Sequence, residues 1–188
     1  MKNNIHLLIF FALMFSPLLA LGISSSMFMM PDSFPHTWQG QYEGQLDIYT
    51  PLGLQQSVEM KLEIMPSDSL DRWIWAITYG PDSIKGRRSY ELMLTDPEKG
   101  YYQIDEKNSI LLDAHLLGNI FTSCFEVMDN LLVATYEKVG EEIIFSIIMS
   151  KTKSPITTGG EVIVGDTIPE VQIYPVGNRQ RARLRKIK

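Results

Sequence analysis

A two-residue alternation that recurs in successive runs from Gln41 to Ser150 constrains the fold of this chain more than any other feature. The stretch from Val58 to Ile64 is the clearest case, because apolar and charged residues alternate there without a slip. Successive side chains of a β-strand point to opposite faces, so this pattern predicts a strand with one buried and one solvated face. Similar alternation recurs in the apolar sets Tyr42/Gly44/Leu46/Ile48, Trp73/Trp75/Ile77/Tyr79, Tyr90/Leu92/Leu94, Ile110/Leu112/Ala114/Leu116, Phe121/Phe125/Val127 and Ile143/Phe145/Ile147/Met149.

Short clusters of Pro, Gly, Asn and Asp separate these runs, and such residues supply the preset or positive φ angles that turns need. The predicted turns are Pro51–Gly53, Pro66–Ser69, Gly80–Ser83, Asp96–Gly100, Asp105–Asn108, Gly118–Asn119, Asp129–Asn130 and Gly140–Glu141. Links of hairpin length force neighbouring strands to be antiparallel. We therefore predict an all-β protein, an antiparallel up-and-down meander that closes into a barrel of roughly eight to ten strands.

The first 22 residues have the organisation of a signal peptide. Lys2 gives a weakly basic start, residues 5–21 are almost wholly apolar, and Ala20-Leu21-Gly22 fits the small-x-small cleavage rule. A retained membrane anchor is the alternative, but Ser16-Pro17 interrupts the apolar run and a span needs ~20 apolar residues. We predict that residues 1–22 direct export and that no membrane span remains after cleavage.

After the signal peptide we expect a connecting segment, residues 23–40, and one barrel domain, residues 41–188. Two prolines in the connecting segment predict a turn or short helix that can close one end of the barrel. The single cysteine, Cys124, cannot form an internal disulfide, which favours the periplasm or the outside of a bacterium. Nothing nearby in sequence would activate its thiol, so we expect a packed residue rather than a nucleophile.

The C-terminal part differs from the meander in composition. Prolines and glycines break residues 151–178 into a long loop, with short strands predicted at 161–164 and 171–174. Residues 179–188 carry six positive charges and no acid, while residues 23–178 have a net charge of −12. The basic stretch is either a free tail for an anionic partner or a last strand with its arginines outward. The alternation of Arg181 to Arg185 favours the strand.

Two resemblances to known proteins accompany these patterns. The segment from Trp38 to Gly44, a Trp followed by spaced glycines, resembles the opening of calycin barrels such as lipocalins, fatty-acid-binding proteins and nitrobindin-like proteins. Residues 90–92 and 102–110 are similar to uncharacterised exported proteins of Bacteroidetes. The first resemblance implies a lipocalin-like barrel. Nitrobindin-like proteins hold haem with a late histidine, but none follows His115 here, so we expect no cofactor.

No catalytic or metal signature occurs in the chain, because HExxH, CxxC, P-loop and GxSxG patterns are all missing. His36 lies before the first predicted strand, and His115 shares a polar face with Asp113, which favours a solvated side chain. We therefore predict no catalytic residue and no metal ligand. An enzyme whose residues converge only in three dimensions stays open as an alternative.

One group of residues is a candidate ligand site. Arg88 has the parity of Tyr90 and the two leucines that follow, so its guanidinium should face the interior or the rim beside a tyrosine hydroxyl. That pair would suit a ligand carboxylate or phosphate. The predicted site residues are Arg88, Tyr90, Trp73, Trp75, Tyr79, Tyr102 and Tyr136. The alternative is that Arg88 reaches solvent and the aromatic residues fill the core.

Three functions remain compatible with the sequence. The first is a binding module for a small apolar or amphipathic molecule inside the barrel. The second is a structural or interaction protein of the cell envelope with a filled core, and the third is an envelope enzyme without a sequence signature. We expect no nucleic-acid partner, and no residue pattern identifies a protein partner.

Overall fold

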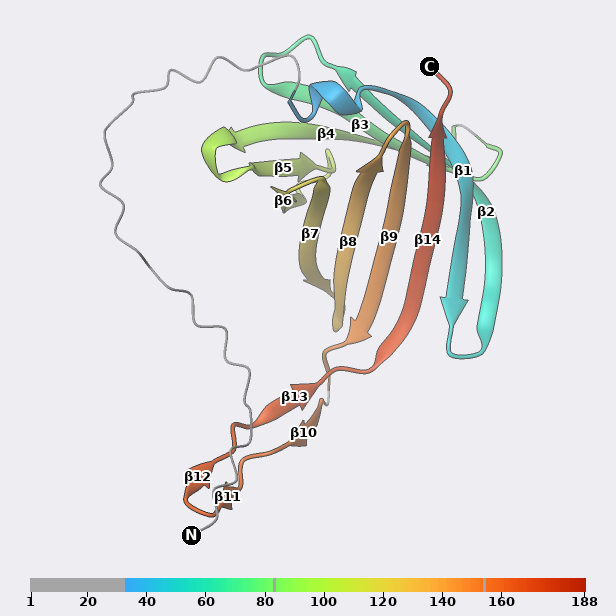
Figure 1. The fold of residues 1–188 in the computed structure, drawn as a ribbon. Coiled ribbons are helices and arrows are strands. Elements are labelled where there is room, and N and C mark those ends of the chain that lie inside the picture. The colour runs from blue at the N-terminus through green and yellow to red at the C-terminus, as the bar shows by residue number, and fades with distance from the viewer. Residues whose placement is uncertain (1–32, 83, 154) are drawn as a thin grey trace, which may run out of the picture. The chain divides into compact units, whose positions relative to one another are not determined.

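The computed structural model of the protein describes residues 33–82, 84–153 and 155–188 and contains a closed barrel of ten antiparallel strands (Figure 1). The predicted all-β meander and its closure into a barrel are confirmed. The barrel strands are β1 (Gly40–Thr50), β2 (Gly53–Pro66), β3 (Arg72–Tyr79), β4 (Arg87–Asp96), β5 (Tyr101–Asp105), β6 (Leu111–Leu117), β7 (Ile120–Val127), β8 (Asn130–Val139), β9 (Glu142–Lys151) and β14 (Val176–Lys186). The predicted signal peptide lies outside the described residues.

The predicted alternation places one face of each barrel strand inside. On β1, Tyr42 and Leu46 are buried and Glu43 is exposed. Leu46 lies in register with Val58 on β2 and with Ala182 on β14, so inward residues of neighbouring strands pack side by side. β14 is the last strand that the basic stretch predicted, and it lies between β9 and β1, where it closes the barrel.

The turns form where the sequence placed them, and the link between β4 and β5 illustrates why. It is a short 3-10 helix, η2 (Pro97–Lys99). The Asp96 carboxylate accepts a hydrogen bond from the Lys99 backbone N–H at 3.4 Å, which caps the helix. Gly100 ends it with a φ of 61°, a conformation that glycine adopts without steric cost.

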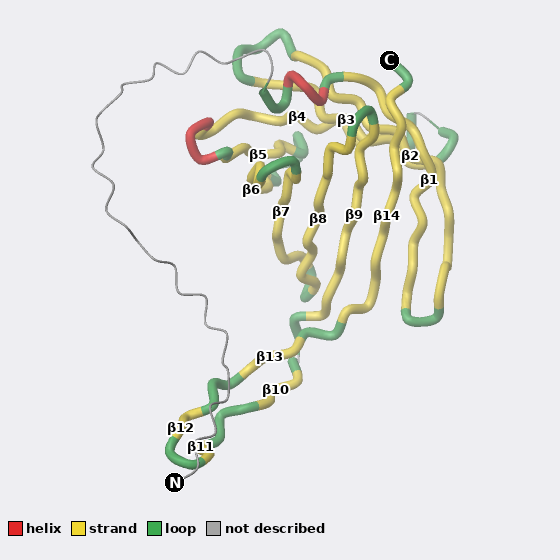
Figure 2. Tube along the Cα trace, viewed as in Figure 1, coloured by secondary structure: helices red, strands yellow, loops and turns green. Residues whose placement is uncertain are grey.

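A second 3-10 helix, η1 (His36–Trp38), closes one end of the barrel, as expected for the segment before β1 (Figure 2). Phe34 and Trp38 are buried in the core. The Tyr42 hydroxyl donates a hydrogen bond to the Trp38 carbonyl oxygen at 2.8 Å, and the Tyr102 hydroxyl donates to the Phe34 carbonyl oxygen at 3.2 Å. These contacts fix the closed end. No helix in the described ranges is long and apolar enough to cross a membrane.

The opposite end, where the links β1–β2, β3–β4, β5–β6 and β7–β8 lie, is the open end of the barrel. Along β9, Ile143 and Phe145 near the closed end are 0% and 1% exposed, whereas Ile147 is only half-buried. Along β1, burial decreases in the same direction, because Leu46 is buried and Ile48 is only half-buried. Other half-buried inward residues toward this end are Val58, Tyr79, Tyr90, Leu112, Phe125, Leu132, Asn178 and Gln180, while Leu94 and Leu116 are half-buried near the closed end. Solvent therefore reaches the inner wall through the open end.

Between β9 and β14 the chain leaves the barrel as an arm, described for residues 152–153 and 155–175 (Figures 1 and 2). Short strands pair within the arm, namely β10 (Ile156–Thr158) with β13 (Val171–Ile173) and β11 (Val162–Ile163) with β12 (Asp166–Thr167). The predicted strands at 161–164 and 171–174 correspond to β11 and β13. Their partners β10 and β12 were not predicted, because a stretch of two or three residues is too short to show a two-residue alternation.

Three expectations about single residues are wrong, and the first is Val127, which was expected inside but is 45% exposed at the end of β7. Cys124 is exposed rather than packed, because the inward face of β7 is formed by Phe121 and Ser123 and Cys124 has the opposite parity. Ile110 was expected inside but is 44% exposed. It lies in the turn before β6, where its carbonyl oxygen accepts a hydrogen bond from the Glu106 N–H at 3.0 Å. The strand period therefore does not extend to it.

Gly44 is expected to be essential for barrel closure. A Cβ atom on this residue of β1 would lie 2.2 Å from the Arg183 carbonyl oxygen of β14, so Gly44→Ala must push the two strands apart. We expect the free energy of unfolding to fall by about 1–3 kcal/mol, the usual cost of overpacking. Chemical denaturation measures it. Gly177→Ala is the matched control, since nothing lies within 4 Å of its added Cβ, and a loss as large in the control would contradict the steric explanation.

Candidate functional site

The structure divides the seven predicted site residues into two groups. The buried group, with exposed fractions of 6% or less, is Trp73, Trp75, Tyr102 and Tyr136. The more accessible group on the inward faces of β3 and β4 is Tyr79, Tyr90 and Arg88, of which Arg88 is exposed. All seven have the inward parity that the sequence predicted. They nevertheless occupy different environments.

Aromatic rings fill the closed half of the barrel. The ring centroid of Phe121 lies 4.9 Å from that of Phe34, 5.3 Å from Trp75 and 5.8 Å from Tyr102. Tyr136 extends the cluster by an edge-on contact with Trp75 at 5.1 Å. Such edge-to-face pairs add stabilisation beyond the area that they bury. The rings of Trp75, Tyr102 and Tyr136 therefore pack against other side chains, which limits any ligand space to the open half.

Three tyrosine hydroxyls lie near one another in the interior: those of Tyr79, Tyr90 and Tyr136. Burial raises the pKa of Tyr79 to about 12, with Tyr90 adding to the rise and Arg88 opposing it. Burial also raises the pKa of Tyr136, and the nearby Tyr79 adds to it. The Trp75 indole nitrogen is close enough to the Tyr136 hydroxyl to oppose this rise, yet it makes no hydrogen bond of ordinary geometry. Among the described residues, the hydroxyls of Tyr79 and Tyr90 form no hydrogen bond.

The interior holds further polar atoms without partners. Trp75 Nε1, Ser123 Oγ and Asn178 Oδ1 are buried and make no hydrogen bond within the described chain. Ser123 lies in register between Ala114 on β6 and Ala134 on β8, so this part of the wall carries small side chains. Buried polar groups are ordinarily hydrogen-bonded, and an unsatisfied one costs about 1–3 kcal/mol. These groups are therefore suited to a polar ligand or to ordered water.

Arg88 lies at the rim of this space. Its Nη1 donates to the carbonyl oxygens of Lys85 at 3.2 Å and Arg87 at 3.3 Å, which ties the guanidinium to the β3–β4 loop. No carboxylate in the described ranges pairs with it. Arg87, on the outer face of the same strand, instead forms an ion pair with Glu63 at 3.2 Å. The inward arginine is thus a cation that is available to an anionic group at the open end.

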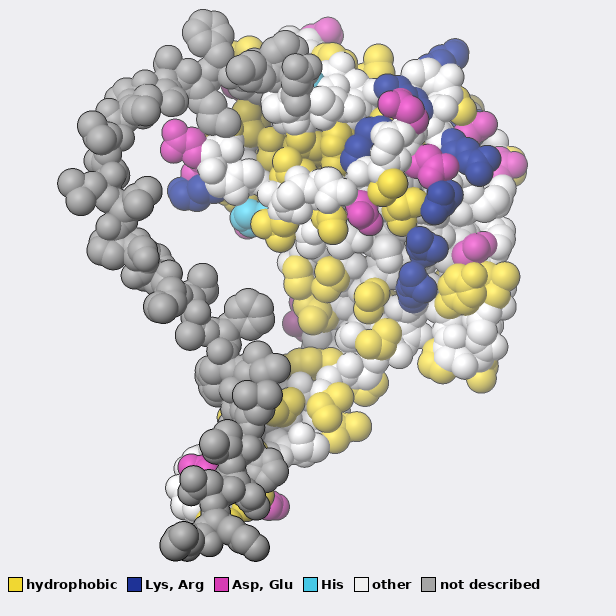
Figure 3. Space-filling model, in the orientation of Figure 1, with side chains coloured by type: hydrophobic (Ala, Val, Ile, Leu, Met, Phe, Trp, Pro, Cys, Tyr) yellow, Lys and Arg dark blue, Asp and Glu magenta, His cyan; other side chains and the backbone are white. Residues whose placement is uncertain are grey.

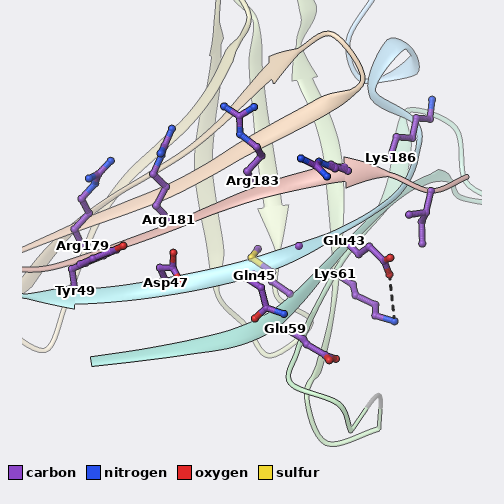
Figure 4. Close-up of a pocket in the computed structure, with 14 residues that line it drawn as sticks. Glu43, Gln45, Asp47, Tyr49, Glu59, Lys61, Arg179, Arg181, Arg183 and Lys186 are labelled. Atoms are coloured by element: carbon purple, nitrogen blue, oxygen red, sulfur yellow. Dashed lines mark ion pairs between the residues drawn. The ribbon is translucent and has the colours of Figure 1, made fainter. Parts of the chain in front are cut away.

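A hollow lies on the outer face of the barrel, where β14, β1 and β2 form a groove of about 930 Å³ that we call the arginine groove (Figure 4). Its charged and amide side chains are Glu43, Gln45, Asp47, Glu59, Lys61, Arg179, Arg181, Arg183, Arg185 and Lys186. The sequence predicted that the arginines face outward. It did not reveal the acidic wall, although the outward parity of β1 and β2 contains that signal.

Other candidate chemistry is sparse in the described ranges. No three His, Cys, Asp or Glu side chains there gather in a way that could hold a metal ion. His115 is exposed, as expected, and its ring stacks on Tyr101 with centroids 5.1 Å apart. His36 lies in η1 against Trp73. The chain was also compared with protein-family models and with curated proteins, and it matches none of them.

Proposed function

We propose that the protein is an exported binding protein that holds one small amphipathic molecule in the open half of its barrel. The observation that carries this proposal is the pair of hydroxyls on Tyr79 and Tyr90, which form no hydrogen bond within the described residues and belong to half-buried inward side chains in a mostly apolar wall. Sites for small molecules are concave and mostly apolar, and a few polar groups fix the ligand's orientation. Barrels of at least eight strands are wide enough for one such ligand.

The polar groups indicate the chemistry of the ligand's head. Each tyrosine hydroxyl is protonated at neutral pH, because the ordinary tyrosine pKa of about 10 lies well above it and burial raises the pKa further, and so each can donate a hydrogen bond. Arg88 adds a cation at the rim. A carboxylate accepts from both kinds of donor, and such charge-assisted bonds are the strong ones. The apolar body of the ligand would lie against the half-buried inward residues such as Leu112 and Ile147. A fatty acid has this chemistry.

Arg88→Met is the direct test of the head-group interaction. The substitution removes the charge and keeps much of the side-chain stem. We expect affinity for a long-chain fatty acid to fall by about 1.5–3 kcal/mol, the value of a hydrogen bond to a charged group. Stability should hardly change, because an exposed arginine contributes little to the core. Titration calorimetry of both proteins with the fatty acid and with the matching fatty alcohol gives the comparison.

Arg87→Met is the matched control, because it removes the neighbouring cation on the outer face. It should leave binding of the acid unchanged, and the alcohol should bind wild type and Arg88→Met equally. Tyr90→Phe should weaken both ligands by about 0.5–1.5 kcal/mol, since a hydroxyl and a carboxylate both accept its bond. Binding of neither ligand by the wild type would contradict the proposal and favour the envelope protein with a filled core.

A further inference from the structure

A row of four arginines runs along the outer face of β14. Arg179, Arg181, Arg183 and Arg185 alternate with inward residues, and all four are exposed. A strand rises about 3.4 Å per residue, so neighbouring guanidiniums are anchored about 7 Å apart. Figure 3 shows Lys and Arg side chains gathered over this part of the barrel wall. The chain as a whole has a net charge of −5, so the row is a local cationic feature on an acidic protein.

Half of the row has no acidic partner. Arg183 and Arg185 share Glu142, at 2.7 Å and 3.2 Å. Arg179 and Arg181 form no ion pair or hydrogen bond with any described residue. Asp47 lies directly across from Arg181 in the β1–β14 register, yet its carboxylate accepts a hydrogen bond from the Ser57 hydroxyl instead. Two adjacent guanidiniums are therefore available to anions from outside the chain.

The other wall of the arginine groove has different chemistry. Figure 4 shows Asp47 of β1 next to the arginine row, and Gln45 of β1 and Glu59 of β2 farther from it, toward the β2 side of the groove. In total, six cationic and three anionic side chains line the groove. Carboxylate and amide oxygens accept hydrogen bonds from hydroxyl groups. The groove thus combines cationic donors, which suit regularly spaced anions, with acceptors, which suit hydroxyl groups. A polymer that carries both anionic groups and hydroxyls would match this arrangement.

We propose that the arginine groove binds a linear anionic polysaccharide. Its acid groups would pair with Arg179 and Arg181, and its sugar hydroxyls would donate to Asp47 and Glu59. A single-stranded nucleic acid needs aromatic platforms on which bases stack, and Tyr49 is the one aromatic residue that lines this groove. A concave surface between strands also suits a chain better than a flat bilayer. This site is on the outer wall and is independent of the ligand site inside the barrel.

Titration calorimetry of the full chain with polygalacturonate, neutral dextran and poly-dT tests the proposal. We expect polygalacturonate to bind with an affinity that falls as salt rises, because counterions are released, and dextran not to bind. The double variant Arg179→Gln/Arg181→Gln should bind polygalacturonate at least about tenfold more weakly, since it loses two charge-assisted contacts. The control Lys85→Gln/Lys153→Gln removes the same charge from exposed side chains elsewhere and should change affinity less than about twofold.

Glu59→Gln separates sugar recognition from simple charge attraction. If the carboxylate accepts from sugar hydroxyls, this variant weakens polygalacturonate binding, because the amide is the poorer acceptor. Tighter binding would mean that only net charge matters and would overturn the proposal. Equal weakening in the two double variants, equal affinity for poly-dT, or no binding of polygalacturonate by the wild type would each overturn it as well.

Discussion

Deleting residues 179–188 is expected to abolish cooperative folding of the barrel. The deletion removes Ala182 and Leu184, which are 1% and 0% exposed, and most of the β14 pairing with β9 and with β1. The loss of the buried leucine side chain alone costs about 1.5–3 kcal/mol, and each lost backbone hydrogen bond adds about 1 kcal/mol. The total is comparable to the whole stability of a domain. Thermal and urea denaturation followed by circular dichroism would show the loss.

The open barrel should also associate, because β1 and β9 would both present unpaired edges. Light scattering would detect these aggregates. The double variant Arg179→Gln/Arg181→Gln is the matched control, since it removes charge and keeps the strand. Its free energy of unfolding should stay within about 0.5 kcal/mol of the wild type. An unchanged melting temperature after the deletion would contradict the structural role assigned to β14.

Phe121→Ala is expected to have the largest effect of any single core substitution proposed for this chain. Phe121 is 1% exposed and contacts Phe34, Trp75 and Tyr102 at ring-centroid distances below 6 Å. Replacing a buried phenylalanine with alanine leaves a cavity and costs about 3–5 kcal/mol. Because Phe34 precedes η1 and packs on Phe121, we also expect the closed end to loosen. Urea denaturation and hydrogen exchange of the Trp38 amide, which donates to the Pro35 carbonyl oxygen at 3.0 Å, would measure the two effects.

Phe125→Ala provides the comparison, since Phe125 lies on the same face of the same strand but nearer the open end and is only half-buried. Its substitution should cost about 1–2 kcal/mol, because less area leaves water on folding. A cost equal to that of Phe121→Ala would mean that the open half is packed as tightly as the closed half. The ligand site proposed there would then lose its space.

The strands and turns of the meander were predictable because both depend on local chemistry. Alternation with a period of two places one face of a strand inside wherever the strand lies in the barrel. Turn residues such as Gly100 act through their own φ angle. For the same reason, β14 was predictable from Arg181 to Arg185. Ile110 was misplaced because the start of a strand depends on neighbouring segments. Cys124 was misplaced because the exposure of a residue on the outer face also depends on neighbouring segments.

The sequence predicted which strand face each candidate site residue occupies, but it did not predict how far each lies from the closed end of the barrel. The sequence placed Arg88 and Tyr90 on the inward face, and the register agrees. It could not show that Trp75 and Tyr136 lie among other rings while Tyr79 lies in the accessible half. Depth within a barrel depends on which end is covered. Here Phe34 and Trp38 cover one end through contacts with strands far along the chain.

By itself, the sequence determined the fold class, the order of the nine strands β1 to β9, their inward faces and the outward row of arginines. These properties follow from residue period and turn chemistry, which act over a few residues. Only the tertiary structure decided that β14 lies beside β1, because that pairing joins residues at least 130 positions apart, such as Tyr49 and Arg179. The same closure places Arg181 opposite Asp47 and forms the groove, since a surface that two distant strands share exists only once the barrel has closed.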